Sequence, residues 1–368
     1  MKKAAALLML VCLASACVLC APLMLRDTKS LAMGRTGMTS FNEAGSYFLN
    51  PAALYYKSDS SLVTLSGSFS DCLDTDALRD ALPNAALTRP TASGSASFTG
   101  RYAAVSVRIT NILLLDSYPD DSSGRYNAYN VSDLQLTVAY GWSSFAAGFS
   151  VNGGNLMTRE NLTIRSSGAF YEYLLKTYFE RYYHVLGSEY VSFAVGLMGR
   201  IGPFTLALTF DDLTKVTSSS MASLSMDAML STMNFGVRYS GSRYNTRTTG
   251  LIPVVPFVSI ELHNAFADTV AGTDAAVELP GHGMKQRRTE LCAGLELMVQ
   301  LSSRLSVSLM GGFCSGGIGS LFFRGGSHSL GLGMKGNNIQ AQVFAEIPIS
   351  MYFGTGDVCI GLSGSVSF

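Results

Sequence analysis

From Ser61 to the C-terminus, apolar residues alternate with small or polar residues at a spacing of two. A period of two places successive side chains on opposite faces of a β-strand. The last strand shows the pattern most clearly, and its apolar face comprises Val358, Ile360, Leu362, Val366 and Phe368. Its opposite face carries only glycine, serine and cysteine between Cys359 and Ser367. The chain is therefore predicted to be all-β, with strands that each present one apolar face.

The overall composition indicates that this apolar face meets lipid. Only 14% of the residues are charged, against about 25% in soluble domains. After the first 25 residues, the sequence has no apolar run of the roughly 18 residues that a spanning helix needs. Strands cross lipid only as a closed barrel, because every backbone N–H and C=O must be paired. The sequence thus predicts a transmembrane antiparallel β-barrel, and its zero net charge argues against nucleic acid as a partner.

The alternation predicts about 14 strands, an even number as single-chain bacterial barrels require. The predicted strands begin near Ser61, Gly94, Tyr102, Val131, Phe145, Tyr190, Phe204, Met233, Leu251, Glu290, Leu305, Gly326, Asn338 and Val358. Short turns join some pairs, and longer polar stretches such as Asp116–Asn127 and Ala265–Arg288 are predicted to be loops. Short turns at one end and long loops at the other are typical of outer-membrane barrels.

The N-terminus reads as an export signal, and we assign residues 1–20 to it. Lys2 and Lys3 precede an apolar stretch from Ala4 to Leu13, which is the pattern of a secretory signal. Two cleavage sites remain open. Cleavage before Cys17 would make a lipoprotein, and cleavage before Ala21 would be that of an ordinary signal peptidase. We favour the second.

Residues 21–60 lack strand periodicity and carry two short motifs. Ser30-Leu31-Ala32-Met33-Gly34-Arg35-Thr36-Gly37 is followed by Asn50-Pro51-Ala52-Ala53-Leu54. Together, immediately ahead of a barrel pattern, they resemble the N-terminal hatch of the FadL/TodX family of outer-membrane channels for long-chain fatty acids and other hydrophobic compounds. The residues that carry this resemblance, and that we expect to form the hatch, are Gly34, Gly37, Asn50, Pro51 and Ala52.

The resemblance implies an architecture and a function. Family members form a 14-stranded barrel whose lumen is plugged by the hatch. The resemblance implies such a barrel here over residues 61–368. The implied function is passive import of long-chain fatty acids or other hydrophobic ligands across the bacterial outer membrane. No cofactor is implied. The implied partners are outer-membrane lipid, a hydrophobic small molecule and the barrel-assembly machinery, for which Val366 and Phe368 are the expected C-terminal signal.

Two of the predicted long loops are partly helical and apolar. The stretch from Ala169 to Leu186 is rich in aromatic residues, and the stretch from Ser219 to Met233 is rich in methionine. In family members, helices in the third and fourth extracellular loops form a hydrophobic groove. The candidate groove residues here are Leu174, Tyr178, Tyr182, Met226 and Met229. The alternative is that these side chains only pack the loops onto the barrel mouth.

Charged residues also occur on the strand face opposite the lipid. The phase of the alternation assigns five of them to the lumen: Arg108, Arg238, Glu261, Glu296 and Glu346. On the lipid face an arginine would cost about 2–4 kcal/mol at the bilayer midplane, so a lumen position is favoured. Such a set forms either a structural network or a selective passage, and we favour the network.

No catalytic or metal-binding motif accompanies this pattern, so an enzyme is not predicted. The four histidines are dispersed, and the cysteines outside the signal region, Cys72, Cys292, Cys314 and Cys359, match no metal spacing. Two other functions remain open. One is a general porin for polar solutes, and the other is a surface-exposed adhesin whose loops bind partner proteins.

Overall fold

The computed structural model describes most of the barrel and two parts of the region before it. The described ranges are residues 28–40, 46–56, 63–73, 91–120, 123–165, 188–211, 230–241, 254–267, 276–279, 283–286, 289–315, 326–349 and 358–368. The candidate groove residues of the two apolar loops lie outside these ranges. The described residues contain sixteen strands, three short helical elements and the turns between them.

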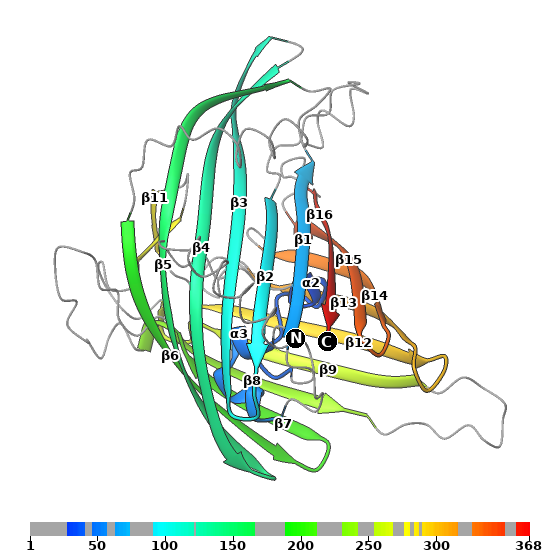
Figure 1. The fold of residues 1–368 in the computed structure, drawn as a ribbon. Coiled ribbons are helices and arrows are strands. Elements are labelled where there is room, and N and C mark those ends of the chain that lie inside the picture. Colours follow the sequence, from blue (N-terminus) through cyan, green and yellow to red (C-terminus); the bar gives the residue numbers. More distant parts are fainter. Residues whose placement is uncertain are drawn as a thin grey trace, which may run out of the picture.

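Fourteen of the strands form one closed antiparallel barrel (Figure 1). They are β1 (Val63–Leu73), β2 (Thr91–Thr99), β3 (Ala103–Asp120), β4 (Ser123–Trp142), β5 (Phe145–Arg165), β6 (Ser188–Ile201), β7 (Phe204–Phe210), β8 (Met233–Ser240), β9 (Val254–His263), β12 (Glu290–Gln300), β13 (Ser306–Cys314), β14 (Ser327–Lys335), β15 (Ile339–Pro348) and β16 (Val358–Ser367). Each pairs with its neighbours in chain order, and β1 closes the ring against β16. The predicted 14-stranded antiparallel barrel is therefore confirmed.

The two faces of the wall differ as the alternation predicted. Along β4, Leu134, Leu136, Val138 and Tyr140 are exposed, whereas Asp133, Gln135, Thr137 and Ala139 are buried. On β16, Ile360, Leu362 and Val366 are exposed on the outside. Closure leaves no unpaired strand edge, so an outer surface of this kind is stable in hydrocarbon.

Aromatic rings gather at the end of the barrel where the short turns lie. Tyr102 and Tyr140 lie 5.8 Å apart between ring centroids, and Phe204 and Tyr239 lie 5.6 Å apart. Trp142 is also there and is 61% exposed. Aromatic girdles mark the bilayer interface of outer-membrane barrels, and their short turns face the periplasm. A closed barrel with an apolar outer belt belongs in the bacterial outer membrane, as predicted.

One predicted loop is wrong. Asp116–Asn127 was expected to be a long polar loop, but β3 continues to Asp120 and β4 begins at Ser123. The two strands pair with register shifts along this extension. The backbone hydrogen bonds of an antiparallel pair do not require apolar alternation, so the polar stretch gave no strand signal. Within Ala265–Arg288, the strands β10 (Ala276–Leu279) and β11 (Gly283–Gln286) form a separate two-stranded sheet.

The region before the barrel folds into short helices. These are α2 (Thr28–Ala32), α3 (Ser46–Leu49) and the 3₁₀ helix η1 (Pro51–Tyr56). They lie within the ring of strands, where α2 contacts β13 to β16 and η1 contacts β4 to β6 (Figure 1). We call residues 28–40 and 46–56 the N-terminal segment. None of the helices in the described ranges has the length and hydropathy to span a bilayer.

Candidate functional site

The N-terminal segment is buried against the inward-facing side of the wall. Ala32, Thr36, Asn50, Ala52 and Ala53 are 0% exposed. Three small apolar clusters join the segment to wall residues, and one of them packs Tyr47 and Leu54 against Ala104 and Ala139. The segment is thus held along its length rather than at one point.

Two cations share one buried carboxylate at the start of the segment. Lys29 Nζ lies 2.8 Å from Glu296 Oε2, and Arg238 Nη2 lies 3.4 Å from the same oxygen. Ser308 donates to the other oxygen at 2.8 Å. Arg238 also donates to Ser40 Oγ at 2.6 Å. One carboxylate oxygen of the wall thus contacts a cation of the segment and a cation of the neighbouring wall.

A second ion pair fixes the turn after α2. Arg35 donates through Nε and Nη2 to Glu346 Oε1, at 3.0 and 2.9 Å. Its Nη1 lies 3.8 Å from Glu290 Oε1. Arg35 has a φ of 66°, and Gly34 before it has a φ of 65°. A Cβ at Gly34 would lie 2.3 Å from the backbone nitrogen of Phe313, so this position accepts only glycine.

Glu261 of β9 binds the middle of the segment. The side chain is fully buried, and its Oε1 accepts hydrogen bonds from the backbone N–H groups of Gly37 and Thr39, at 2.9 and 3.3 Å. Thr39 Oγ1 donates to the same oxygen at 3.1 Å. The other oxygen lies 3.2 Å from His263 Nε2. Backbone donors of the segment are thereby satisfied by a wall carboxylate.

The fifth inward charge, Arg108 of β3, contacts the segment through an aromatic ring. Its guanidinium carbon lies 5.2 Å from the ring centroid of Phe48 and its Nη2 lies 3.0 Å from Asp133 Oδ2. Next to it, the Tyr47 hydroxyl lies 2.8 Å from Ser106 Oγ. Burial raises the pKa of the Tyr47 phenol, and the hydrogen bond to Ser106 opposes that shift. All five charges assigned to the lumen therefore contact the N-terminal segment.

The Asn-Pro-Ala motif forms the start of η1. Asn50 Oδ1 accepts the N–H of Ala52 at 3.0 Å, which is the geometry of a helix N-cap. Pro51 follows at the first helical position, where the missing N–H costs nothing. Asn50 Nδ2 donates to the carbonyls of Met38 and Leu197, at 3.1 and 3.4 Å. One asparagine side chain thus links both parts of the segment and β6.

Glycines of the wall make room for the segment. A Cβ at Gly148 would lie 2.3 Å from the carbonyl carbon of Pro51. At Gly312 it would lie 2.2 Å from the backbone nitrogen of Gly34. Both distances are far below van der Waals contact and involve backbone atoms, which have no rotamer to move. By contrast, a Cβ at Gly153, also on β5, meets nothing within 4 Å.

A cavity of about 270 Å³ lies beside the Lys29–Glu296–Arg238 cluster. Its lining mixes the charged cluster with apolar side chains. The apolar lining residues are Phe257, Met298, Met310 and Met334. Ser240, Ser306 and Lys335, which end or begin strands at the short-turn end, also line it. The cavity is thus amphipathic and lies towards the short turns.

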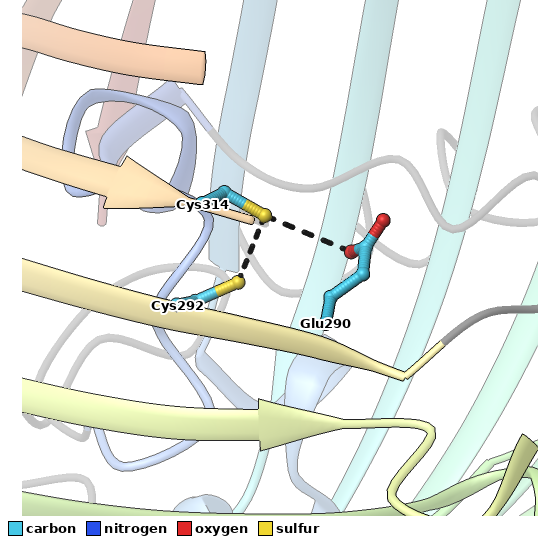
Figure 2. Close-up of side chains that lie close together, drawn as sticks. All are labelled: Glu290, Cys292 and Cys314. Atoms are coloured by element: carbon cyan, nitrogen blue, oxygen red, sulfur yellow. Dashed lines mark hydrogen bonds between the residues drawn. The ribbon is translucent and has the colours of Figure 1, made fainter. Parts of the chain in front are cut away.

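One group in the described part of the chain brings three potential metal ligands together (Figure 2). Cys314 Sγ lies 3.1 Å from Cys292 Sγ and 3.8 Å from Glu290 Oε2. The two cysteines are buried, and Glu290 is partly exposed. The spacing of 22 residues between the cysteines gave no signal in the sequence, because only the pairing of β12 with β13 brings them together.

Several site residues were not expected from the sequence. Lys29 and Arg35 precede the barrel pattern and carry no periodic signal, yet they hold the two principal ion pairs. Gly148, Gly196 and Gly312 read as ordinary strand glycines, and each one faces the N-terminal segment. At the opposite end of the chain, Val366 and Phe368 lie on the exposed outer face of β16 and just beyond it.

Comparisons with known proteins rest on structure alone. No family model matches the chain, and no curated protein matches its sequence. Solved structures do match. The CymD monoaromatic hydrocarbon channel superposes with a TM-score of 0.53 at 11% identity, covering 93% of this chain and 97% of CymD. The P. putida toluene transporter TodX superposes with a TM-score of 0.51 at 9% identity, covering 93% and 98%.

These identities are low, so the likeness concerns the fold. One neighbour is named as a channel and the other as a transporter. The coverage extends over nearly the whole length of each protein, which a chance match of a few strands would not give. The resemblance to a FadL/TodX-type channel is therefore confirmed at the level of the fold, and this chain has the barrel architecture of the TodX and CymD hydrocarbon channels.

Proposed function

We propose that this protein is a passive importer of hydrophobic ligands in the bacterial outer membrane, and that its N-terminal segment is the hatch. The observation that carries the proposal is that the five wall charges assigned to the lumen from the sequence all contact this segment. In this assignment residues 1–20 are the export signal, 21–60 the hatch and 61–368 the barrel. The wall charges then form a binding surface for the hatch rather than the lining of an open pore.

The contacts support a hatch with two states. Ion pairs and hydrogen bonds to backbone are directional, so a small displacement of the segment weakens several of them together. A ligand that binds the displaced state better shifts the population towards it. No energy source is needed, because the ligand moves down its own concentration gradient. The same charges, once released, are hydrated by water that enters the lumen.

We further propose that the ligand is a long-chain fatty acid. The cavity beside Lys29 and Arg238 combines the cationic groups of these two residues with methionine and phenylalanine side chains. A carboxylate with an acyl chain matches both features, since guanidinium groups bind carboxylates through charge-assisted hydrogen bonds. Toluene and other monoaromatic hydrocarbons, which TodX and CymD are named for, carry no such charge. The cavity lies towards the periplasmic end, so it would receive the ligand after the hatch has moved.

The two apolar loops are the proposed entry site for the ligand. We propose that Leu174, Tyr178 and Tyr182, with Met226 and Met229, form the groove on which a ligand first lands. Methionine side chains adapt to varied apolar partners, and aromatic rings offer large apolar areas.

Equilibrium binding of oleate and oleyl alcohol to the purified barrel tests the ligand class, because the two probes share a chain and differ in charge. We expect oleate to bind the unmodified protein more tightly than an unrelated barrel. Arg238→Gln should weaken oleate binding about tenfold, the effect of losing roughly 1.4 kcal/mol of a charge-assisted contact, and leave oleyl alcohol unchanged. Arg304→Gln is the matched control, since Arg304 is an exposed arginine of the β12–β13 turn.

Four results would contradict parts of this proposal. Oleate binding no tighter than to an unrelated barrel would contradict the proposed import function. Equal weakening of oleate and oleyl alcohol by Arg238→Gln would remove the carboxylate assignment but keep a hydrophobic ligand. Large, steady ionic currents through the unmodified protein would favour the porin. An adhesin would lose partner binding, with oleate uptake intact, when residues 169–186 are removed.

A further inference from the structure

The barrel register pairs all four cysteines that follow the predicted signal. Cys72 of β1 lies opposite Cys359 of β16, and Cys292 of β12 lies opposite Cys314 of β13. The first pair lies at the seam that closes the barrel, and the second lies within the β12–β13 hairpin. Cys359 is disulfide-bonded. The second pair is present as two thiols.

Both pairs occupy the same kind of position in the antiparallel ladder. Ser315 N–H donates to Leu291 O at 2.9 Å, so Leu291 and Ser315 form a hydrogen-bonded pair. Pair types alternate along an antiparallel ladder, so the adjacent Cys292–Cys314 pair is non-hydrogen-bonded. Val63 and Phe368 form a hydrogen-bonded pair of the β1–β16 ladder. Counting the alternation from that pair shows that Cys72–Cys359 is a non-hydrogen-bonded pair as well. At such positions the Cα atoms are about 4.5 Å apart and the side chains are closest, within the range that a disulfide spans.

The side chains of the second pair already touch. Cys292 Sγ and Cys314 Sγ are 3.1 Å apart on the inward face, and both residues are almost completely buried, at 0% and 1% exposed. Figure 2 shows the two sulfurs turned towards each other from neighbouring strands, with the Glu290 carboxylate beyond Cys314. Cys314 Sγ lies 3.8 Å from Glu290 Oε2, which places a proton acceptor next to one thiol.

We propose that the assembled barrel holds a disulfide between Cys292 and Cys314, a covalent link between β12 and β13 directly beside the docking site of Arg35. The proposal does not depend on the ligand. The oxidant is a protein or small-molecule disulfide of the oxidising cell envelope. Cys314, whose proton passes to Glu290, attacks one sulfur of the oxidant and releases its first thiol. Cys292 then attacks Cys314 Sγ, and the bond from Cys314 to the oxidant breaks. The departing sulfur takes the proton of Cys292 and leaves as the second thiol, so two thiols are oxidised as one disulfide is reduced.

Burial fixes the order of events. In the folded barrel Gly34 packs against Phe313, and Arg35 lies between Glu290 and Glu346. An attacking disulfide must approach a cysteine sulfur in line, and the buried pair offers no surface for it. The oxidation therefore precedes docking of the N-terminal segment, and the finished link is shielded from reductants.

Peptide mapping of the unmodified full chain tests this. The protein is purified from outer membranes and denatured without reductant, in the presence of iodoacetamide to alkylate free thiols. It is then digested with trypsin and analysed by mass spectrometry. Trypsin cuts after Arg304, which separates the two cysteines. We expect peptides 289–304 and 305–324 to appear joined, and Cys359 serves as the internal control for a disulfide that survives the procedure. A reductant added before denaturation should leave the Cys292–Cys314 link intact, and the same reductant added after denaturation should remove it.

Two outcomes would overturn the proposal. One is alkylation of both Cys292 and Cys314 while Cys359 stays linked, and one zinc ion per chain would then assign the group with Glu290 to a metal instead. The other is a link from either cysteine to Cys72 or Cys359. Reduction of the link in the folded barrel as fast as in the denatured chain would contradict the proposed order of events. Because the unmodified protein is used, none of these results depends on a variant that folds.

Discussion

Arg35 of the N-terminal segment places both Nε and Nη2 on one oxygen of Glu346 of β15, at 3.0 and 2.9 Å. The contact joins residues 311 positions apart in the sequence. It fixes a turn whose backbone is left-handed at two consecutive residues, Gly34 and Arg35. A strained turn of this kind persists only where the surroundings hold it, and here the wall does so.

We expect Arg35→Gln and Glu346→Gln each to destabilise docking of the segment. A hydrogen bond to a charged group contributes about 1.5–3 kcal/mol, and the partial exposure of Arg35 favours the lower end. The double variant should cost less than the sum of the single variants, because each single change leaves an unpaired partner. Heat-dependent mobility of the barrel on gels gives the unfolding temperatures of the unmodified protein, the two single variants and the double variant. Strictly additive effects would contradict a direct contact.

Docking of the segment should depend more on the acceptor oxygens of Glu261 than on its charge. Glu261→Ala leaves three donors of Gly37 and Thr39 without their acceptor, and each buried unpaired donor costs about 1–3 kcal/mol. Glu261→Gln keeps an acceptor oxygen and the side-chain volume. Hydrogen exchange of peptides from residues 28–40 should therefore rise strongly in the alanine variant and moderately in the glutamine variant. Equal exchange in all three proteins would show that Glu261 does not hold the segment.

Adding one methyl group to the wall should displace the segment without disturbing the barrel. In Gly148→Ala the new Cβ meets the backbone of Pro51, and the segment must move. Gly153→Ala on the same strand places the same methyl in open space and is the matched control. Chymotrypsin should cleave after Tyr47 and Tyr55 faster in the first variant than in the second. Identical cleavage of both variants would mean that the segment does not pack on β5.

The segment should undock at alkaline pH through Tyr47. Burial raises the pKa of this phenol, so the docked segment keeps Tyr47 neutral while a released segment ionises near its ordinary pKa of about 10. Docking is therefore fully stable below about pH 10 and weakens as the pH rises above it. Tyr47→Phe removes the titrating group and should abolish this part of the pH dependence. Hydrogen exchange of residues 46–56 is measured in both proteins on both sides of pH 10. If another group were responsible, Tyr47→Phe would show the same pH dependence as the unmodified protein.

The barrel was predictable because lipid imposes a strict rule on every strand. Thirteen of the fourteen barrel strands begin within three residues of the predicted positions, and β4 begins at Ser123 rather than at Val131. The exception lies in the polar stretch between Asp116 and Asn127, where the two strands pair although the sequence does not alternate. The inward phase of Arg238, Glu261 and Glu296 follows from the same alternation.

The partners of these charges were not predictable. Lys29 and Arg35 lie in short helices and turns without a period, so no pattern relates them to Glu296 or Glu346. The role of Gly148 is likewise invisible in the sequence, because a strand glycine looks the same whether it faces open space or the backbone of Pro51. Pairing across the closed ring, rather than local sequence, creates these contacts.

The central claim is that the N-terminal segment closes the barrel, and single-channel recording in a planar bilayer tests it most directly. The unmodified protein is compared with a variant that lacks residues 28–56 and retains every barrel strand. We expect a quiet bilayer with the unmodified protein and large, steady ionic currents with the shortened one. Equal currents through both proteins would show that the segment leaves the lumen open, and the account would then be wrong.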